Sequence, residues 1–170
     1  MRCDSRWAAV LLLATPWAWA GDSAYSGLDV DSCVLLQENA EMAWSLSECP
    51  AFAGYRVLLE DSDGRQSLSL VEPSGRPHDL DFASTVTEAF NTLGAKLEWR
   101  FDHGPHGMSP YGLIVRVNTQ GDDDRVRSFL AVVRIGEQVC VVDRLEPEVD
   151  QNIKARIVAD DRSVVSCRRR

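Results

Sequence analysis

The segment FDHGPHGMSPYG, residues 101–112, concentrates side chains whose types and spacing could do chemistry. Asp102, His103 and His106 fall close together, and carboxylate with imidazole at short spacing suits zinc or copper. An H-x-x-H pair without the helical HExxH frame is a weak zinc signal, however, and no fourth ligand is evident. We therefore predict no bound metal and no cofactor. A small metal-dependent hydrolase that uses residues 102–106 stays open as an alternative function.

The glycines and prolines of this segment also predict a flexible hairpin loop whose polar residues face solvent. Loops held by a rigid scaffold often carry binding residues. Ser109 lies near His106, but the G-x-S-x-G turn of a serine hydrolase is absent from the sequence. We assign no catalytic residue and expect a protein that is not an enzyme. The candidate binding residues of this loop are Asp102, His103, His106, Ser109 and Tyr111.

Two further segments invite a functional interpretation. In SECPAFAGYRVLL, residues 47–59, Phe52 would either cap the core beneath a disulfide or serve as an exposed contact for a partner. The acidic triad Asp122–Asp124 lacks the alternating oxygen ligands and the closing glutamate of a calcium loop. We interpret the triad as the charged tip of a hairpin, which keeps neighbouring strand edges from aggregating.

The first twenty residues have the pattern of a cleavable signal peptide. Arg2 and Arg6 precede an apolar run over 8–14 that is too short to span a bilayer, and Ala18-Trp19-Ala20 has the small-x-small form of a cleavage site. We predict cleavage after residue 20, export to the periplasm or secretion, and a single mature domain over 21–170. No later segment is apolar enough for a membrane helix, so we expect no stable membrane insertion.

Four cysteines follow the predicted cleavage site, and an even number in an oxidising compartment predicts two disulfides. Three connectivities are possible, and we predict the pairs that are local in the sequence. The spacings lack the close C-x-x-C pair of a zinc site. The predicted pairs are Cys33–Cys49 and Cys140–Cys167.

The chain carries a formal net charge of −8, and removal of residues 1–20, which hold two arginines and one aspartate, makes it more negative by one. An acidic domain repels phosphate backbones, so the charge argues against nucleic acid as a partner. The remaining partner class is a protein of the cell envelope. The sequence sets no oligomeric state.

Alternating and short apolar runs predict eight strands, and two patterns predict helices. Thr85 and Glu88 form a capping box for a helix over 84–94, and Val149, Ile153 and Ile157 mark the inner side of a helix over about 148–160. The expected fold is α+β, an antiparallel meander of about six to eight strands with one or two helices packed on one face and two disulfides. The strands are expected over 34–36, 42–46, 55–61, 66–71, 96–102, 111–119, 127–135 and 138–145.

Two motifs resemble those of a group of small secreted proteobacterial proteins of unknown function. They are Y-x-x-L-D-x-D-x-C at Tyr25–Cys33 and C-P-x-F-x-G-Y-x-V at Cys49–Val57, and the late strand–helix–Cys unit adds to them. The resemblance implies export and disulfides, and it implies no activity.

The leading hypothesis is an exported, soluble binding or inhibitor-like module without catalytic activity, which presents residues 102–112 to an envelope protein. A compact acidic scaffold with long turns and no catalytic motif supports this hypothesis. The metal-dependent hydrolase is one alternative. A structural protein of the envelope, held by contacts between copies, is the other.

Overall fold

The computed structural model describes residues 21–120 and 125–169, which form ten strands, two helices and one 3-10 turn. The predicted signal peptide and the acidic triad 122–124 lie outside the described residues. The helices are α1 (Phe82–Thr85) and α2 (Gln151–Asp160), and the 3-10 turn η1 covers Ala40–Met42. The strands are β1 (Asp22–Gly27), β2 (Val34–Asn39), β3 (Trp44–Phe52), β4 (Tyr55–Ser62), β5 (Gln66–Val71), β6 (Pro77–Asp79), β7 (Asn91–Gly104), β8 (Gly107–Gln120), β9 (Val126–Arg134) and β10 (Cys140–Leu145).

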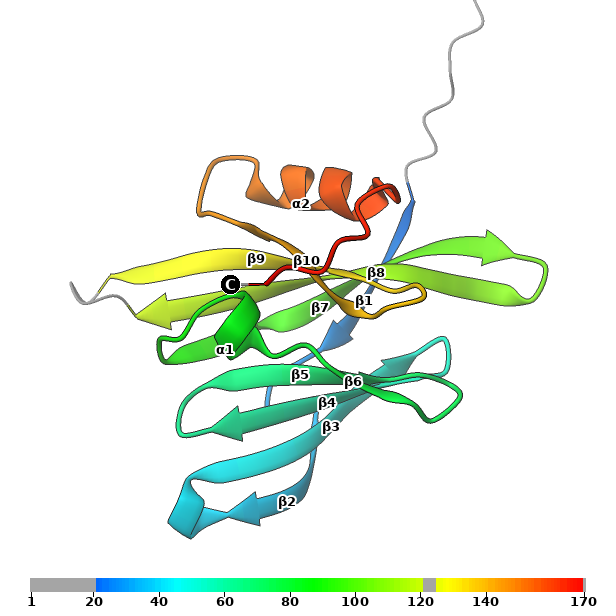
Figure 1. Ribbon diagram of the computed structural model, residues 1–170. Coiled ribbons are helices and arrows are strands. Elements are labelled where there is room, and N and C mark those ends of the chain that lie inside the picture. The colour runs from blue at the N-terminus through cyan, green and yellow to red at the C-terminus, as the bar shows by residue number, and fades with distance from the viewer. Residues whose placement is uncertain (1–20, 121–124, 170) are drawn as a thin grey trace, which may run out of the picture.

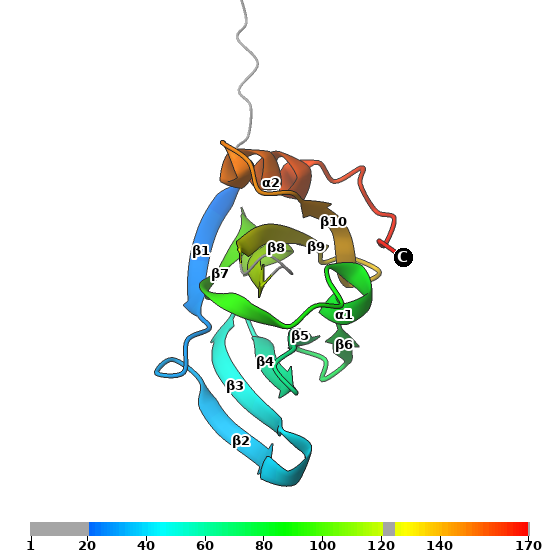
Figure 2. The same ribbon diagram turned by 90° about the vertical axis from the view of Figure 1, so that its left-hand side faces the viewer.

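The strands form two five-stranded sheets, ordered β1-β7-β8-β9-β10 and β2-β3-β4-β5-β6. We call these the first and the second sheet. Figures 1 and 2 show α2 over one face of the first sheet and the second sheet against its other face. Strand pairs within each sheet are antiparallel, and an isolated parallel bridge joins Arg65 to Asn91. The α+β class with a helix packed on one face is confirmed, whereas the single meander of about six to eight strands is wrong, because ten strands form two sheets.

The central strands β8 and β9 of the first sheet are buried on both faces, which explains their nearly continuous apolar runs. Along β8, Leu113 and Val115 point into the main core between the two sheets. Ile114, between them in sequence, joins a smaller core beneath α2 with Leu130 and Val132. Trp99 is fully buried in the main core, where its indole N–H donates to Ser26 Oγ at 3.0 Å.

The helix predicted over 84–94 is wrong. The helix is a single turn, α1, and Asp81 caps it by accepting a hydrogen bond from the Ser84 N–H at 3.2 Å. Residues from Asn91 onward are extended because they pair with β8. The Asn91 side chain also bonds to both backbone groups of Gln66, at 3.1 and 2.9 Å, which ties β7 to β5. Strand pairing therefore overrides a local helix signal that is rich in β-branched residues.

The second predicted helix exists as α2, but its inner face is not the predicted one. Ile153 and Ile157 are 56% and 63% exposed, and Val149 before the helix is exposed as well. Ala155 and Ala159 are fully buried instead. The helix lies close to the sheet above Gly112, where a Cβ would come within 3.8 Å of the Ala159 Cβ. Only small side chains fit at that distance, so the large isoleucines face outward.

This packing predicts opposite responses on the two faces of α2. Ala159→Leu should lower the free energy of unfolding by about 2 kcal/mol, because the added volume has no space above Gly112. Ile157→Ala should change it by less than about 0.5 kcal/mol, since the side chain is mostly exposed. Urea unfolding of both variants measures the difference. Equal destabilisation would contradict the assigned inner face.

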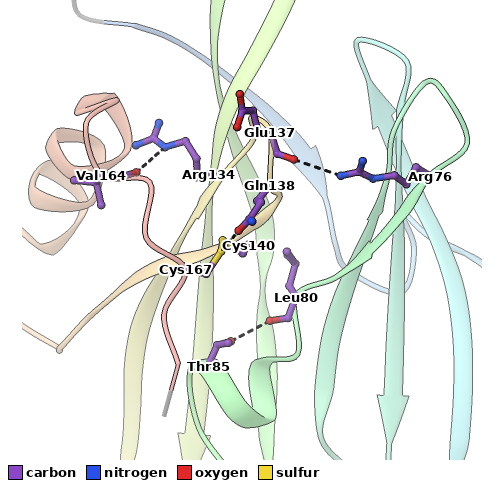
Figure 3. The surroundings of a disulfide bond; sticks show 9 residues. All are labelled: Arg76, Leu80, Thr85, Arg134, Glu137, Gln138, Cys140, Val164 and Cys167. Atoms are coloured by element: carbon purple, nitrogen blue, oxygen red, sulfur yellow. Dashed lines mark hydrogen bonds between the residues drawn. A yellow bond between two sulfur atoms is a disulfide. The ribbon is translucent and has the colours of Figure 1, made fainter.

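Both predicted disulfides are confirmed. Cys33 and Cys49 join the start of β2 to β3, and Cys140 joins the start of β10 to Cys167 in the C-terminal segment. The second disulfide draws this segment back along β10 below α2, as Figure 3 shows. Two disulfides indicate an oxidising compartment such as the periplasm or the cell exterior. Within residues 21–120 and 125–169, no helix has the length and apolarity to cross a membrane.

Candidate functional site

The segment predicted as a binding loop is the end of a long β-hairpin. Asp102 pairs with Ser109 and His103 pairs with Met108, so the loop prediction for these residues is wrong. The turn itself is only Pro105 and His106, between Gly104 and Gly107. Gly107 has a φ of 111°, a conformation that favours glycine. Antiparallel pairing rather than a flexible loop therefore fixes where these side chains lie.

A groove of about 580 Å³ lies at the base of this hairpin, beside the C-terminal end of α2. It brings together β1, β7, β8, α2 and the segment that follows α2. Three predicted binding residues, Asp102, His103 and Tyr111, line it, whereas His106 and Ser109 are exposed and are not part of its lining. The full lining is Gly21, Asp22, Phe101, Asp102, His103, Tyr111, Asp160 and Arg162.

A second hollow of about 510 Å³ shares Tyr111 and Arg162 with this groove. Its other walls come from the β9–β10 connection, from Arg134 and from Val165. The two hollows therefore meet at Tyr111 and Arg162, and we call them together the α2 groove.

Asp160, the last residue of α2, accepts hydrogen bonds from two side chains at the α2 groove. Arg100 donates to it from Nε at 2.9 Å and from Nη2 at 2.7 Å, and the Tyr111 hydroxyl donates at 2.7 Å. Burial acts to raise the pKa of Asp160, but the hydrogen bonds and charge of Arg100 and the bond from Tyr111 outweigh it, so the pKa is lowered. Asp160 is thus a fixed anion at neutral pH.

Tyr111 and Arg100 both keep their protons and donate hydrogen bonds to the Asp160 carboxylate. Burial and the hydrogen bond to Asp160 raise the pKa of Tyr111, so its hydroxyl stays protonated and acts as a donor. Burial acts to lower the pKa of Arg100, and the bond and charge of Asp160 overcome it. Arg100 also donates to the Gly21 carbonyl at 2.6 Å. A Cβ on Gly21 would lie 1.7 Å from the Tyr111 hydroxyl, so only glycine fits there.

Arg162 lines the α2 groove at the protein surface. Its guanidinium lies over the Tyr111 ring, 4.1 Å from the centroid, and bonds to Asp102 at 2.5 Å. The hydrogen bond to Asp102 and its charge raise the pKa of Arg162. Both partners are about half exposed, so the pair contributes on the order of 0 to 1 kcal/mol and can be exchanged for other contacts.

His103 lies next to an aspartate of β1 and packs against an aromatic ring. Its Nε2 lies 3.0 Å from Asp22 Oδ2, and its ring packs edge-on against Phe101. His106 is at the hairpin turn, while His78 lies in β6 of the other sheet and bonds to Glu72 at 2.6 Å. The described part of the chain contains no group of three or more His, Cys, Asp or Glu arranged to hold a metal ion.

Phe52, predicted as a core cap or an exposed contact, is half-buried. Its ring lies 5.2 Å from Trp99 and 5.1 Å from Phe101, measured between centroids. This is an anchoring position between the two sheets, next to the Cys33–Cys49 disulfide in β3. These ring contacts favour the core-cap interpretation of Phe52, and its role as a contact for a partner stays a prediction.

Sequence reasoning missed the arginines that build the α2 groove. Arg134 follows an apolar run at the end of β9, is 6% exposed, and donates to carbonyls at the end of α2 and beyond. The acceptors at 2.7 and 2.8 Å are Asp161 O and Ala159 O, and Figure 3 shows the bond to Val164 O at 3.2 Å. The available signal was an arginine that directly follows the apolar run 129–133.

Comparison with protein-family models, with curated proteins and with solved structures found no match for this chain.

Proposed function

We propose that this chain is an exported binding protein without catalytic activity, and that the α2 groove takes up an exposed polypeptide segment of an envelope protein. The observation that carries the proposal is the pair of hollows, about 580 and 510 Å³, that meet at Tyr111 and Arg162. Sites of this size with an aromatic wall and a few convergent polar groups are the usual form of binding sites.

The charges of the α2 groove favour a peptide-like ligand. Asp22 and Asp102 offer carboxylates, and Arg162 offers a guanidinium beside an aromatic ring. A polypeptide segment carries hydrogen-bond donors, acceptors and charges of both signs at short spacing, so it can satisfy such a mixed wall. The weak Arg162–Asp102 pair can open to admit it.

The protonation states in the groove argue against acid–base catalysis. A general acid or base works best when its pKa lies near the operating pH. The pKa of Asp160 is lowered and the pKa of Tyr111 is raised, so both groups move away from neutrality. This argues against Asp160 and Tyr111 as a general acid or base.

Site-specific photo-crosslinking tests the proposal. The chain, with residues 1–20, is expressed in its own host with a benzophenone amino acid at His103 inside the groove, or at exposed Val149 as the matched control. We expect one dominant adduct of defined mass from position 103 that is absent from position 149. Arg162→Glu should reduce it at least about tenfold, because the guanidinium is replaced by a repelling carboxylate.

Two outcomes would count against the α2 groove. Identical adducts from positions 103 and 149 would mean unspecific contact. An adduct that persists undiminished in Arg162→Glu and in alanine variants of 102, 103 and 111 would place the ligand elsewhere on the protein. A dominant adduct between two copies of the chain would favour the structural envelope protein instead.

A further inference from the structure

The second sheet ends in a strand, β2, whose outer edge has no partner among the described residues. β2 pairs with β3 on one side and is the terminal strand in the order β2-β3-β4-β5-β6. Figures 1 and 2 show β2 at the far end of the molecule from α2. An edge strand presents a row of unpaired N–H and C=O groups that can pair with another chain.

β2 is unusually open and apolar for an edge. All six of its residues are exposed, including Val34, Leu35 and Leu36. Met42, in the turn that follows, is 71% exposed. Natural edges are normally protected by charge, proline or a covering segment, so an exposed apolar edge marks an interaction surface.

The edge is also held in place before any partner arrives. The Cys33–Cys49 disulfide fixes the start of β2 to β3. At the other end, Asn39 caps η1 by accepting a hydrogen bond from the Met42 N–H at 3.2 Å. A strand that is already ordered loses little conformational entropy when another strand adds to it, which favours binding.

The charge around this edge selects the partner. Residues 29–63 contain eight acidic side chains and a single basic one, Arg56, which already bonds to Glu48 at 2.7 and 2.9 Å. In the part of the chain that the structure describes, neither Glu38 nor Glu41 forms an ion pair. A second copy would bring like charges together, whereas a basic segment would be attracted.

We infer that the free edge of β2 is a docking site for an extended, basic segment of a partner protein, which adds to the second sheet as a further strand. Main-chain hydrogen bonds to β2 supply affinity, and alternate apolar side chains of the segment cover the exposed apolar side chains on one face of β2. The register shift between Leu35 and Gln37 bends this edge, which disfavours flat pairing between two copies. This site is separate from the α2 groove.

Titration with a designed probe tests the inference. The probe is an end-blocked peptide of alternating valine and lysine, and the control probe is the same peptide N-methylated at every second residue, which keeps its charge but cannot pair along one edge. We expect the first peptide to bind the mature chain with a Kd in the micromolar range. Amide NMR shifts should change over 34–39, and the N-methylated peptide should bind at least about tenfold more weakly.

Matched variants locate the site. Leu35→Lys with Leu36→Lys should weaken binding at least about tenfold, since it adds positive charge and removes the apolar contact. Ile153→Lys with Ile157→Lys makes the same change of charge on the exposed face of α2 and should leave binding unchanged. Both double variants change only exposed residues, and a native circular dichroism spectrum confirms their folding.

Three results would overturn the inference. If the N-methylated peptide binds as tightly as the first peptide, binding comes from unspecific attraction between charges and not from strand pairing. NMR shifts spread over other strands would place the peptide elsewhere. A dimer in sedimentation that Leu35→Lys with Leu36→Lys abolishes would make a second copy the occupant of β2.

Discussion

Replacing Arg134 with methionine should lower the free energy of unfolding by about 4 kcal/mol and the melting temperature by about 10 °C. Arg134 is a buried cation at the C-terminal end of α2, where the helix dipole is negative and carbonyls lack helical partners. Its five N–H groups reach five backbone carbonyls, those of Tyr111, Val158, Ala159, Asp161 and Val164. Methionine fills similar volume but satisfies none of them.

Neighbouring and conservative variants separate this role from a general loss of charge. Arg162→Met removes an arginine that also lines the α2 groove but is half exposed, so it should cost less than about 1 kcal/mol. Arg134→Lys should recover less than half of the loss, because an ammonium cannot reproduce the guanidinium fork. Urea unfolding monitored by tryptophan fluorescence measures all three. If Arg134→Met unfolds at the same urea concentration as the wild type, Arg134 does not anchor α2.

Replacing Asp160 with asparagine should lower the free energy of unfolding by about 3 to 4 kcal/mol at pH 7. Arg100 is only 4% exposed and would lose its bidentate partner. The remaining carboxylate, Glu98, is 3.7 Å away and is already bonded to Arg156 at 2.7 Å. An uncompensated buried cation is costly, since the protein around it replaces its hydration poorly.

The pH dependence of this variant follows from the lowered pKa of Asp160. A carboxyl whose pKa is lower in the folded state stabilises the fold above its unfolded pKa, and this contribution is lost as the pH falls through the folded pKa. The difference in the free energy of unfolding between wild type and Asp160→Asn should therefore be constant around neutral pH. It should shrink once the pH falls below the ordinary aspartate value of 3.8.

Unfolding curves collected from pH 7 down to pH 2 test this dependence. Asp102→Asn is the matched control, because Asp102 also pairs with an arginine in the α2 groove but at the surface. It should cost less than about 1 kcal/mol throughout. A loss in Asp160→Asn that persists undiminished at the lowest pH would show that the carboxylate charge is not its source.

Features that depend on short-range chemistry could be predicted from the residues alone. The pairs Cys33–Cys49 and Cys140–Cys167 followed from even number and local spacing, and the strands from alternating apolar residues. The position of α2 also followed from its pattern. Three of the five predicted binding residues, Asp102, His103 and Tyr111, lie in the α2 groove because they share one hairpin, whose pairing brings distant positions together.

Long-range packing sets which faces are buried and which charged side chains pair. The stripe of Ile153 and Ile157 predicted an inner face, but the close approach of α2 to the sheet admits only Ala155 and Ala159. Residues 84–94 carry helix signals, yet pairing with β8 and bonds to β5 make the segment extended from Asn91. Local patterns cannot report such competition, since its outcome depends on partners that are far away in the sequence.

The α2 groove shows most clearly how long-range packing adds to what local sequence patterns predict. Arg100 and Asp160 are separated by 60 positions, and nothing in their local sequence pairs them. Their bond exists because α2 lies over the side of β7 that carries Glu98 and Arg100, which alternation alone would have left to solvent. The sequence could therefore name the residue types available for binding. The place where these residues form a site depends on α2, which packs across the sheet and buries Arg100 against Asp160.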